Sequence, residues 1–163
     1  MKKQLNLLNN MGKQRRIVGQ FLEIQLPDHT WTYARVLDKA SFAFYDVHSL
    51  NKIADINFLM GKNVLFIAAV FNDAVTSGRW KKIGIYPLEA RFHILPFKFI
   101  QDEIDSADVR LYNPNTGEIF ISNRRACIDL EPAAVWDAEQ IEERIVDYYA
   151  GRTNVWLEKM KLK

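Results

Sequence analysis

Hydrophobic and polar residues alternate through the first part of the chain, and the pattern predicts a β-meander over residues 17–47. Leu22, Ile24 and Leu26 are separated by polar residues, which is the period of a strand with one buried face. Two turn sequences divide this strand from two further segments rich in aromatic and β-branched residues. Three closely connected antiparallel strands predict a small, strongly bent sheet or a partial barrel.

The middle of the chain predicts one short helix and several more strands. Apolar residues near helical spacing favour the helix at 50–60, and glycine follows it at position 61. The apolar runs and turn signals indicate further strands at residues 64–71, 80–86, 96–101, 109–112 and 118–122. The last two of these strands form a predicted hairpin.

The C-terminal helix has the clearest boundary signals. Asp137 is a good N-cap, and Gln140 lies three residues later, where a capping box requires it. Trp136 and Ile141 are spaced to form a hydrophobic staple around the cap. Gly151 is suited to end the helix in the left-handed conformation.

Together these elements predict an α+β fold: a strongly bent antiparallel sheet or partial barrel, a short middle helix and a C-terminal amphipathic helix. The 163 residues fit one domain. We expect a flexible basic extension at 1–16, a single α+β domain at 17–151, and a basic C-terminal tail at 152–163.

The charge distribution changes how the net charge of +2 is interpreted. Residues 1–16 carry five cations and no acids, whereas residues 102–147 carry twelve acids and four bases. Duplex nucleic acid requires a coherent cationic face, so an acidic body makes a nucleic-acid partner unlikely. The absence of a long apolar run predicts no membrane partner. The single cysteine agrees with a reducing compartment, and we expect a cytoplasmic protein.

Candidate catalytic and metal chemistry is sparse. His29, His48 and His93 are scattered, and with one cysteine they do not form a zinc pattern, so no metal is expected. No phosphate-binding glycine loop precedes a helix, so no cofactor is expected either. Cys127 follows two arginines that would favour a thiolate, but the simpler interpretation is a small core residue on a strand.

Four carboxylates lie close together at Asp102, Glu103, Asp105 and Asp108. Their register lacks the glycine and closing glutamate of a calcium-binding loop. They form either a solvated acidic loop or an acidic surface for a basic partner.

The segment 77–84 combines a tryptophan with three cations between two glycines. In an extended strand, Arg79 and Lys81 lie on one face, while Trp80 and Lys82 lie on the other. The cations therefore do not form one basic face. We expect Trp80 to be largely a core residue, with Arg79 and Lys81 as candidate contacts at the rim of an interface.

Several ordered blocks make the chain similar to a known family. They are GQFLEIQLPD at 19–28, YARVL at 33–37, FYD at 44–46, SGRWKKIG at 77–84, PL at 87–88, LEPAAVW at 130–136 and IEERI at 141–145. Together they resemble the immunity protein 26 family of bacterial polymorphic toxin systems over about residues 17–150. The chain departs from that family at His29-Thr30, where a glycine turn is usual, and in its long N-terminal extension.

The resemblance implies an α+β protein that neutralises a cognate toxin domain by direct binding and is not an enzyme. An acidic patch suits a basic toxin such as a nuclease, because opposite charges speed capture. The candidate partner-binding residues are therefore Asp102, Glu103, Asp105, Asp108, Arg79 and Lys81.

Two other functions remain open from the residues alone. A small β-rich module would bind peptide or nucleic acid through Trp31, Tyr33 and Trp80 if these rings are exposed. An enzyme could use Cys127 with a histidine as its base.

Overall fold

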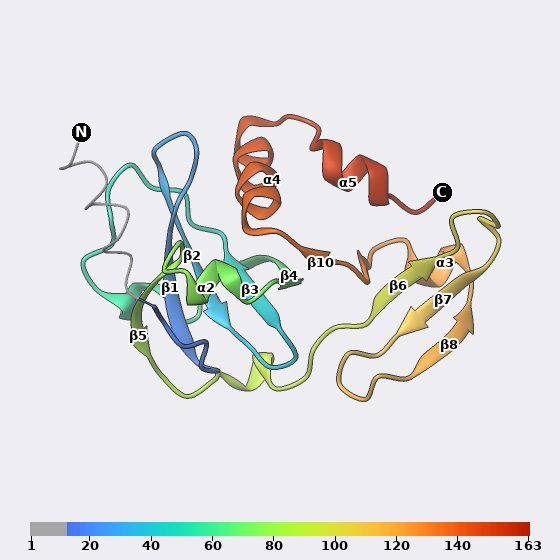
Figure 1. Cartoon of the computed structure of the whole chain (residues 1–163), viewed down its shortest axis with the longest axis horizontal. Coiled ribbons are helices and arrows are strands. Elements are labelled where there is room, and N and C mark those ends of the chain that lie inside the picture. Colours follow the sequence, from blue (N-terminus) through green and yellow to red (C-terminus); the bar gives the residue numbers. More distant parts are fainter. Residues whose placement is uncertain (1–12) are drawn as a thin grey trace.

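A computed structural model of the chain describes residues 13–163 and shows two β-sheets side by side, with helices packed along them (Figure 1). Most of the expected N-terminal extension, residues 1–12, lies outside the described part. The rest of it contacts the body. The Gln14 side chain donates hydrogen bonds to the carbonyls of Val75 and Trp80 at 2.9 and 2.7 Å and accepts one from the Lys82 amide.

The larger sheet, sheet A, contains the predicted meander. Its strand order is β10-β4-β3-β2-β1-β5. The strands are β1 (Gln20–Gln25), β2 (Trp31–Val36), β3 (Ser41–Tyr45), β4 (Val64–Val70), β5 (Lys81–Ile85) and β10 (Val135–Trp136). Register shifts between β1 and β5 and between β3 and β4 mark irregularities of the kind that bend strands. The sheet has two edges and is not closed into a barrel, which confirms the bent-sheet alternative.

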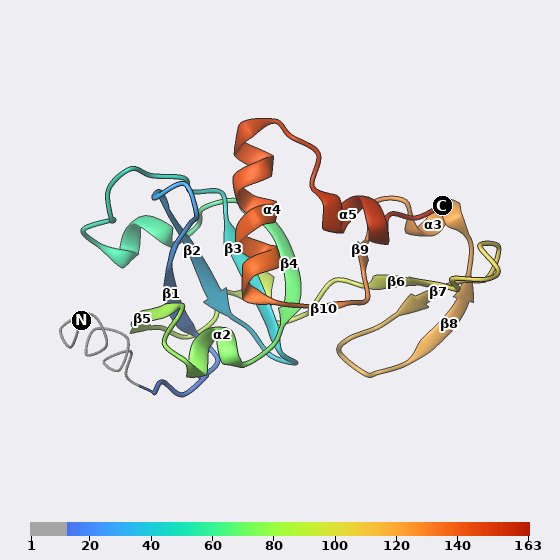
Figure 2. The same cartoon turned by 45° about the horizontal axis from the view of Figure 1, so that its top comes forward.

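Both faces of sheet A are covered, which corrects the half-buried pattern inferred from the sequence. One face packs against helix α4 (Ala138–Ala150), and the other packs against two 3₁₀ turns, η1 (Ile56–Leu59) and η2 (Ala90–Phe92). Figure 2 shows α4 lying along the sheet. The polar residues of the expected solvent face, such as Glu23 and Thr32, are therefore buried. The predicted middle helix is only the η1 turn, and a short helix that was not predicted, α2 (Asp73–Thr76), follows β4.

A buried arginine connects three segments at one end of sheet A. Arg35 on β2 has no exposed surface, and its guanidinium donates hydrogen bonds to the carbonyls of Gly19, Tyr86 and Pro87 at 3.0, 2.8 and 2.9 Å. The same group lies 3.8 Å from the centre of the Phe21 ring. We call these five residues the Arg35 cluster. Gly19 lies at φ 92°, and a Cβ there would meet the Tyr86 carbonyl oxygen at 2.5 Å, so the cluster requires glycine.

The turn that departs from the family pattern is formed without glycine. His29 lies at φ 65°, in the left-handed region that favours glycine. The amide of His29 donates to the Leu26 carbonyl, and the Asp28 carboxylate accepts from the Thr30 amide at 3.1 Å. The β1–β2 connection therefore keeps its shape at the expense of backbone strain at one residue.

The smaller sheet, sheet B, has the order β8-β7-β6-β9. It contains the predicted hairpin, which is confirmed. Its elements are β6 (Lys98–Gln101), β7 (Val109–Tyr112), β8 (Ile119–Ser122), the short helix α3 (Arg124–Cys127) and β9 (Glu131–Pro132). Cys127 is fully buried, as expected for a core residue, but it lies on α3 and not on a strand.

Helix α4 begins and ends as the sequence predicts. Asp137 and Gln140 form the capping box, and Gly151 ends the helix at φ 66°. The segment 152–163, expected as a basic tail, contains helix α5 (Val155–Met160). Beyond it, Leu162 is buried against sheet B, and Lys163 exchanges hydrogen bonds with the Gln101 side chain.

A second polar group attaches α4 to sheet A. The buried carboxylate of Glu142 accepts hydrogen bonds from the Trp80 indole at 2.8 Å and from the Arg79 guanidinium at 2.8 and 2.7 Å. Trp80 is fully buried, and its ring lies 5.6 Å from those of Phe42 and Phe44. The expectation of a core tryptophan is thus confirmed. We call Arg79, Trp80 and Glu142 the Glu142 cluster.

We predict that Glu142→Ala lowers the free energy of unfolding by about 2–3 kcal/mol, because it leaves the buried indole and part of the guanidinium without an acceptor. Urea unfolding measures this change. The matched control is Glu139→Ala, which removes an exposed carboxylate that also contacts Arg79, at 3.2 Å. It should change stability by less than about 0.5 kcal/mol. Equal losses in both variants would show that the Glu142 cluster does not hold α4.

Candidate partner-binding surface

The acidic loop, residues 102–108, connects β6 to β7 at the outer end of sheet B (Figure 1). Asp102 accepts hydrogen bonds from the amides of Ile104 and Asp105 at 2.9 and 2.7 Å, so this carboxylate shapes the loop. Asp108 forms a two-point contact with Arg110, and those hydrogen bonds lower the pKa of the Asp108 carboxyl. The four carboxylates therefore share one exposed loop. Some of their hydrogen bonds go to the loop itself and stabilise its conformation.

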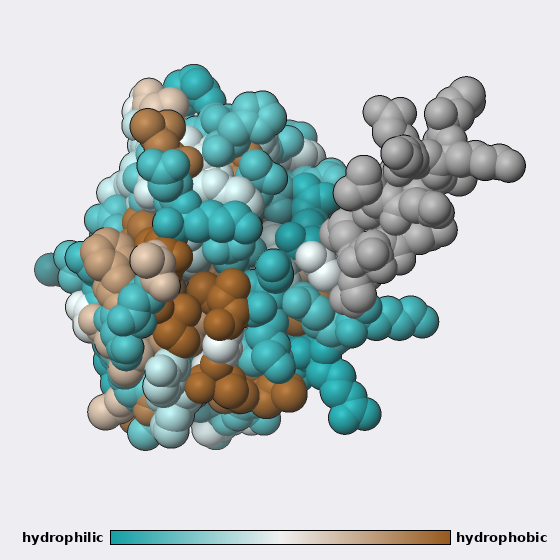
Figure 3. Space-filling view, turned by 90° about the vertical axis from the view of Figure 1, so that its left-hand side faces the viewer, coloured by the Kyte–Doolittle hydropathy of each residue, from teal (hydrophilic) through white to brown (hydrophobic). Residues whose placement is uncertain are grey.

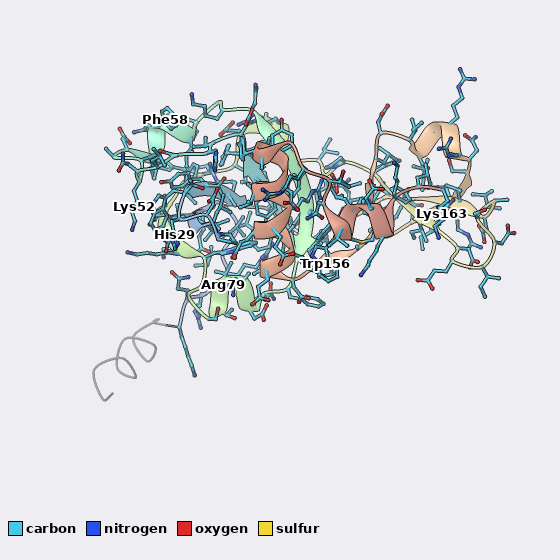
Figure 4. All side chains as sticks on the ribbon, turned by 90° about the horizontal axis from the view of Figure 1, so that it is seen from above. His29, Lys52, Phe58, Arg79, Trp156 and Lys163 are labelled. Atoms are coloured by element: carbon cyan, nitrogen blue, oxygen red, sulfur yellow. The ribbon has the colours of Figure 1, made fainter. Side chains whose placement is uncertain are left out.

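The other two candidate contacts, Arg79 and Lys81, lie elsewhere. Figure 4 shows Arg79 well away from Lys163, which is hydrogen-bonded to Gln101 beside the acidic loop. Arg79 belongs to the Glu142 cluster, and hydrogen bonding to Glu142 raises the pKa of its guanidinium. Lys81 is exposed on β5, the edge strand at the opposite end of the molecule. The sequence-predicted residues thus form two separate groups.

The aromatic residues proposed for the alternative binding module do not form an exposed platform. Tyr33 and Trp80 are fully buried. Trp31 is half-buried, and the Lys52 ammonium lies 4.4 Å from its ring centre. Stacking on nucleic-acid bases needs accessible ring faces, so this arrangement does not favour that alternative.

The strand register of sheet B separates its side chains onto two faces. Phe99, Leu111 and Phe120 are opposite one another across the three strands and therefore share one face. That face packs on α3 and on the C-terminal segment through Cys127 and Leu162. Figure 2 shows α3 and α5 beside sheet B, on the side of this covered face.

The opposite side of sheet B, which we call the open face, is not covered by a helix of the described chain. By register it carries Ile100, Tyr112, Ile119, Ile121, Arg110 and Lys98. Ile121 is 92% exposed and Ile119 is 53% exposed. Both lie on β8, which pairs only with β7 and leaves its other edge unpaired. An exposed edge strand with three consecutive apolar residues is a template for a partner.

The β5 edge of sheet A is protected against pairing with another strand, in contrast to the β8 edge of sheet B. Strand β5 carries Lys81 and Lys82 in the strand, and charged residues discourage edge pairing. The strand β8 contains no charge in Ile119–Ser122. Sequence reasoning predicted the hairpin but missed its open face. The available signal was the uninterrupted run Ile119-Phe120-Ile121 in a strand expected to be half-exposed.

Apolar residues also gather at the other end of the molecule (Figure 3). The exposed apolar residues near β5 include Ile17, Val18, Phe58, Ile85 and Tyr86. Residues 1–12 precede this end and lie outside the described part, so the exposure of Ile17 and Val18 does not establish a free surface. The open face of sheet B does not have this ambiguity and is the stronger candidate.

Other site types find little support among residues 13–163. No group of three or more histidine, cysteine or acidic side chains is placed to hold a metal ion. Cys127 has its sulfur 3.8 Å from the Ser122 hydroxyl and is enclosed in the core below sheet B. No helix in the described part combines the length and the hydropathy needed to cross a membrane.

Comparison with known proteins gives one family. The family model described as immunity protein 26 matches residues 17–110, which is more than half of the chain. The match begins before β1 and ends in β7. No curated protein and no solved structure gives a significant match.

We predict that Ile121→Gln changes the free energy of unfolding by less than about 0.5 kcal/mol, because this side chain makes almost no buried contact. Phe99→Ala, on the covered face of the same sheet, should lower it by about 3 kcal/mol through loss of packing. Chemical unfolding of both variants measures the difference. A large loss in Ile121→Gln would mean that β8 is covered in solution.

Proposed function

Because the chain belongs to the immunity protein 26 family, we propose that it neutralises a cognate toxin domain by binding it directly, without catalysis, in the cytoplasm. Inhibition by binding requires a surface and no nucleophile. The open face of sheet B is the observation that carries the proposal, because Ile119 and Ile121 give it an apolar centre that is largely exposed.

The open face has the composition expected of an interface. Its centre is formed by Ile100, Ile119 and Ile121, and charged residues lie around it. A stable interface typically has such an apolar core inside a polar rim. The free edge of β8 adds unpaired backbone groups, which can accept a strand from the partner.

The acidic loop supplies one side of this rim. Asp102 and Asp108 line the same depression as Ile100, Arg110 and Ile119, so the loop directly adjoins the apolar centre. We infer that the loop faces a basic surface of the toxin, such as the phosphate-binding surface of a nuclease. Opposite charges at the rim would raise the association rate more than they lengthen the lifetime of the complex.

The residues Arg79 and Lys81 would belong to a different surface, because they lie toward the other end of the molecule. That surface, near β5, is the second place where a toxin could bind. The experiments below are designed to separate the two surfaces.

The first experiment is protection of cells that express the toxin domain encoded beside this gene. We predict that the chain protects such cells and co-purifies with the toxin domain. The double variant Ile119→Gln/Ile121→Gln should lose at least about tenfold in affinity, because it removes apolar contacts from the interface centre without adding charge.

The matched control for this variant is Ile85→Gln, which changes an apolar residue of β5 that is 49% exposed. It should bind the toxin domain as the unmodified chain does. If Ile85→Gln abolishes binding and the β8 variant retains it, the interface lies at the β5 end. If the unmodified chain neither protects nor binds, the proposed function is wrong for that toxin.

The second experiment tests the acidic loop by replacing three carboxylates with their amides, which keep the side-chain shape. We predict that the triple variant Glu103→Gln/Asp105→Asn/Asp108→Asn lowers the association rate about tenfold at low salt and that the difference shrinks as salt rises. Stopped-flow mixing with the toxin domain measures the rate.

An equal change in net charge away from the loop controls for general electrostatics. The variant for this purpose is Asp55→Asn/Asp73→Asn/Glu139→Gln. It should slow association much less than the loop variant. Equal rates for the two triple variants would place the acidic loop outside the interface.

A further inference from the structure

A groove of about 340 Å³ lies between the open face of sheet B and the adjoining part of sheet A. Its lining is largely apolar and includes Ile100, Tyr112, Pro114, Ile119, Ala134 and Val135. Ile119 belongs both to the groove and to the exposed strand β8. The groove is therefore continuous with the proposed interface.

One largely buried cation lines this groove without a hydrogen bond or ion pair to the described residues. The Lys98 side chain on β6 is only 4% exposed, and its ammonium has no hydrogen bond or ion pair with any residue in 13–163. The acid nearest by register, Glu131, already forms a two-point contact with Arg144, with one distance of 2.9 Å. Burial lowers the pKa of the Lys98 ammonium.

The Lys98 ammonium lines an open groove and is partly removed from water, and the charge of Glu131 offsets only part of the effect of burial on its pKa. This position is unfavourable for a charge in the free protein. Removing a charge from water costs free energy, and the loss is recovered only when a partner of opposite charge binds it. A methionine of similar length would fill the same space without this penalty. A largely buried lysine without an ion pair is unusual in a folded protein, and such exceptions are often found at binding sites.

We propose that this groove receives a carboxylate side chain of the toxin, flanked by apolar atoms, and that the Lys98 ammonium pairs with that carboxylate in the complex. The identity of the partner rests on the proposed function, whereas the chemistry of the groove does not.

The lining favours a carboxylate over a phosphate. Phosphate sites combine several donors, often arginine forks or backbone amides. Here the only other cation that lines the groove is Lys39, and most of the remaining surface is apolar. Two lysines without an arginine fork, among apolar side chains, fit a small anion carried by an apolar segment, as in an aspartate or glutamate within a β-strand.

The proposal also predicts how the bound segment of the toxin is oriented on the open face. The acidic loop adjoins Ile100 and Ile119 on one side, and Lys98 lies with the same two residues in the groove. A complementary partner therefore presents cations, an apolar centre and a carboxylate in that order. Such a sequence of charges sets the orientation of the partner on the open face.

The first test needs no toxin. The probe is 4-phenylbutyrate, and its neutral amide is the matched control. In amide NMR spectra of the full chain, the acid should shift the resonances of Lys98, Tyr112 and Ile119 at concentrations where the amide leaves them unchanged. The acid should lose this effect in Lys98→Met. Equal shifts by acid and amide, or unchanged shifts in the variant, overturn the proposal.

The second test measures stability and affinity in the same variant. Lys98→Met should raise the melting temperature or leave it unchanged, with a gain of up to about 2–4 °C. It should weaken binding of the neighbouring toxin domain at least about 30-fold. Lys13→Met, the control at an exposed lysine, should change neither. A drop in melting temperature would assign Lys98 a structural role and overturn the proposal.

The two arms separate the possible failures. If the unmodified chain does not bind the toxin domain but the groove discriminates acid from amide, the proposed function fails and the groove assignment stands. If the chain binds the toxin domain and Lys98→Met binds equally well, the groove assignment is overturned and the proposed function stands.

Discussion

The larger sheet depends on a single buried guanidinium. Arg35 lies on a central strand, and its hydrogen bonds go to three backbone carbonyls from two separate segments, before β1 and after β5. A lysine could not replace it, because only the planar fork of arginine reaches several carbonyls at fixed angles. The cation lies on the ring face of Phe21, which offsets part of its desolvation. The entry to β1 and the exit from β5 are thereby fixed relative to each other.

The residues that resemble the family are explained mainly by this scaffold. Gly19, Arg35 and Pro87 belong to three separate sequence blocks and meet in or beside the Arg35 cluster. Arg79 and Trp80 meet Glu142 in the second cluster. These residues stabilise the fold, and most of the proposed recognition residues belong to neither cluster. The distinction between scaffold and site follows from burial, because Arg35, Trp80 and Glu142 at the centres of the clusters are buried, whereas β8 is exposed.

Local signals were sufficient for some elements and insufficient for others. The boundaries of α4 could be predicted because the capping box and Gly151 act within a few residues. The burial of Trp80 was expected from its apolar character, but strand alternation does not explain it, because Trp80 precedes β5 and its indole is held by Glu142 of α4. The burial of Glu23 and Arg35 could not be predicted, because it depends on η1 and η2, which pack on the sheet from distant parts of the sequence. The acidic loop was visible as a cluster, but its place beside the apolar centre of the open face depends on strand register. The lack of an ion pair at Lys98 was invisible for the same reason, since Arg144 of α4 engages the nearby Glu131.

The separation of the two sheets has a consequence for how such proteins diversify. The family match ends at residue 110, so β8 and the segment at 133–135 lie beyond it, whereas Lys98, Ile100 and the acidic loop lie within it. Substitutions on β8 alter an exposed surface and leave the Arg35 and Glu142 clusters untouched, so they change the unfolding free energy little. If β8 forms the proposed interface, substitutions on this strand can therefore change which toxin is bound with little effect on folding.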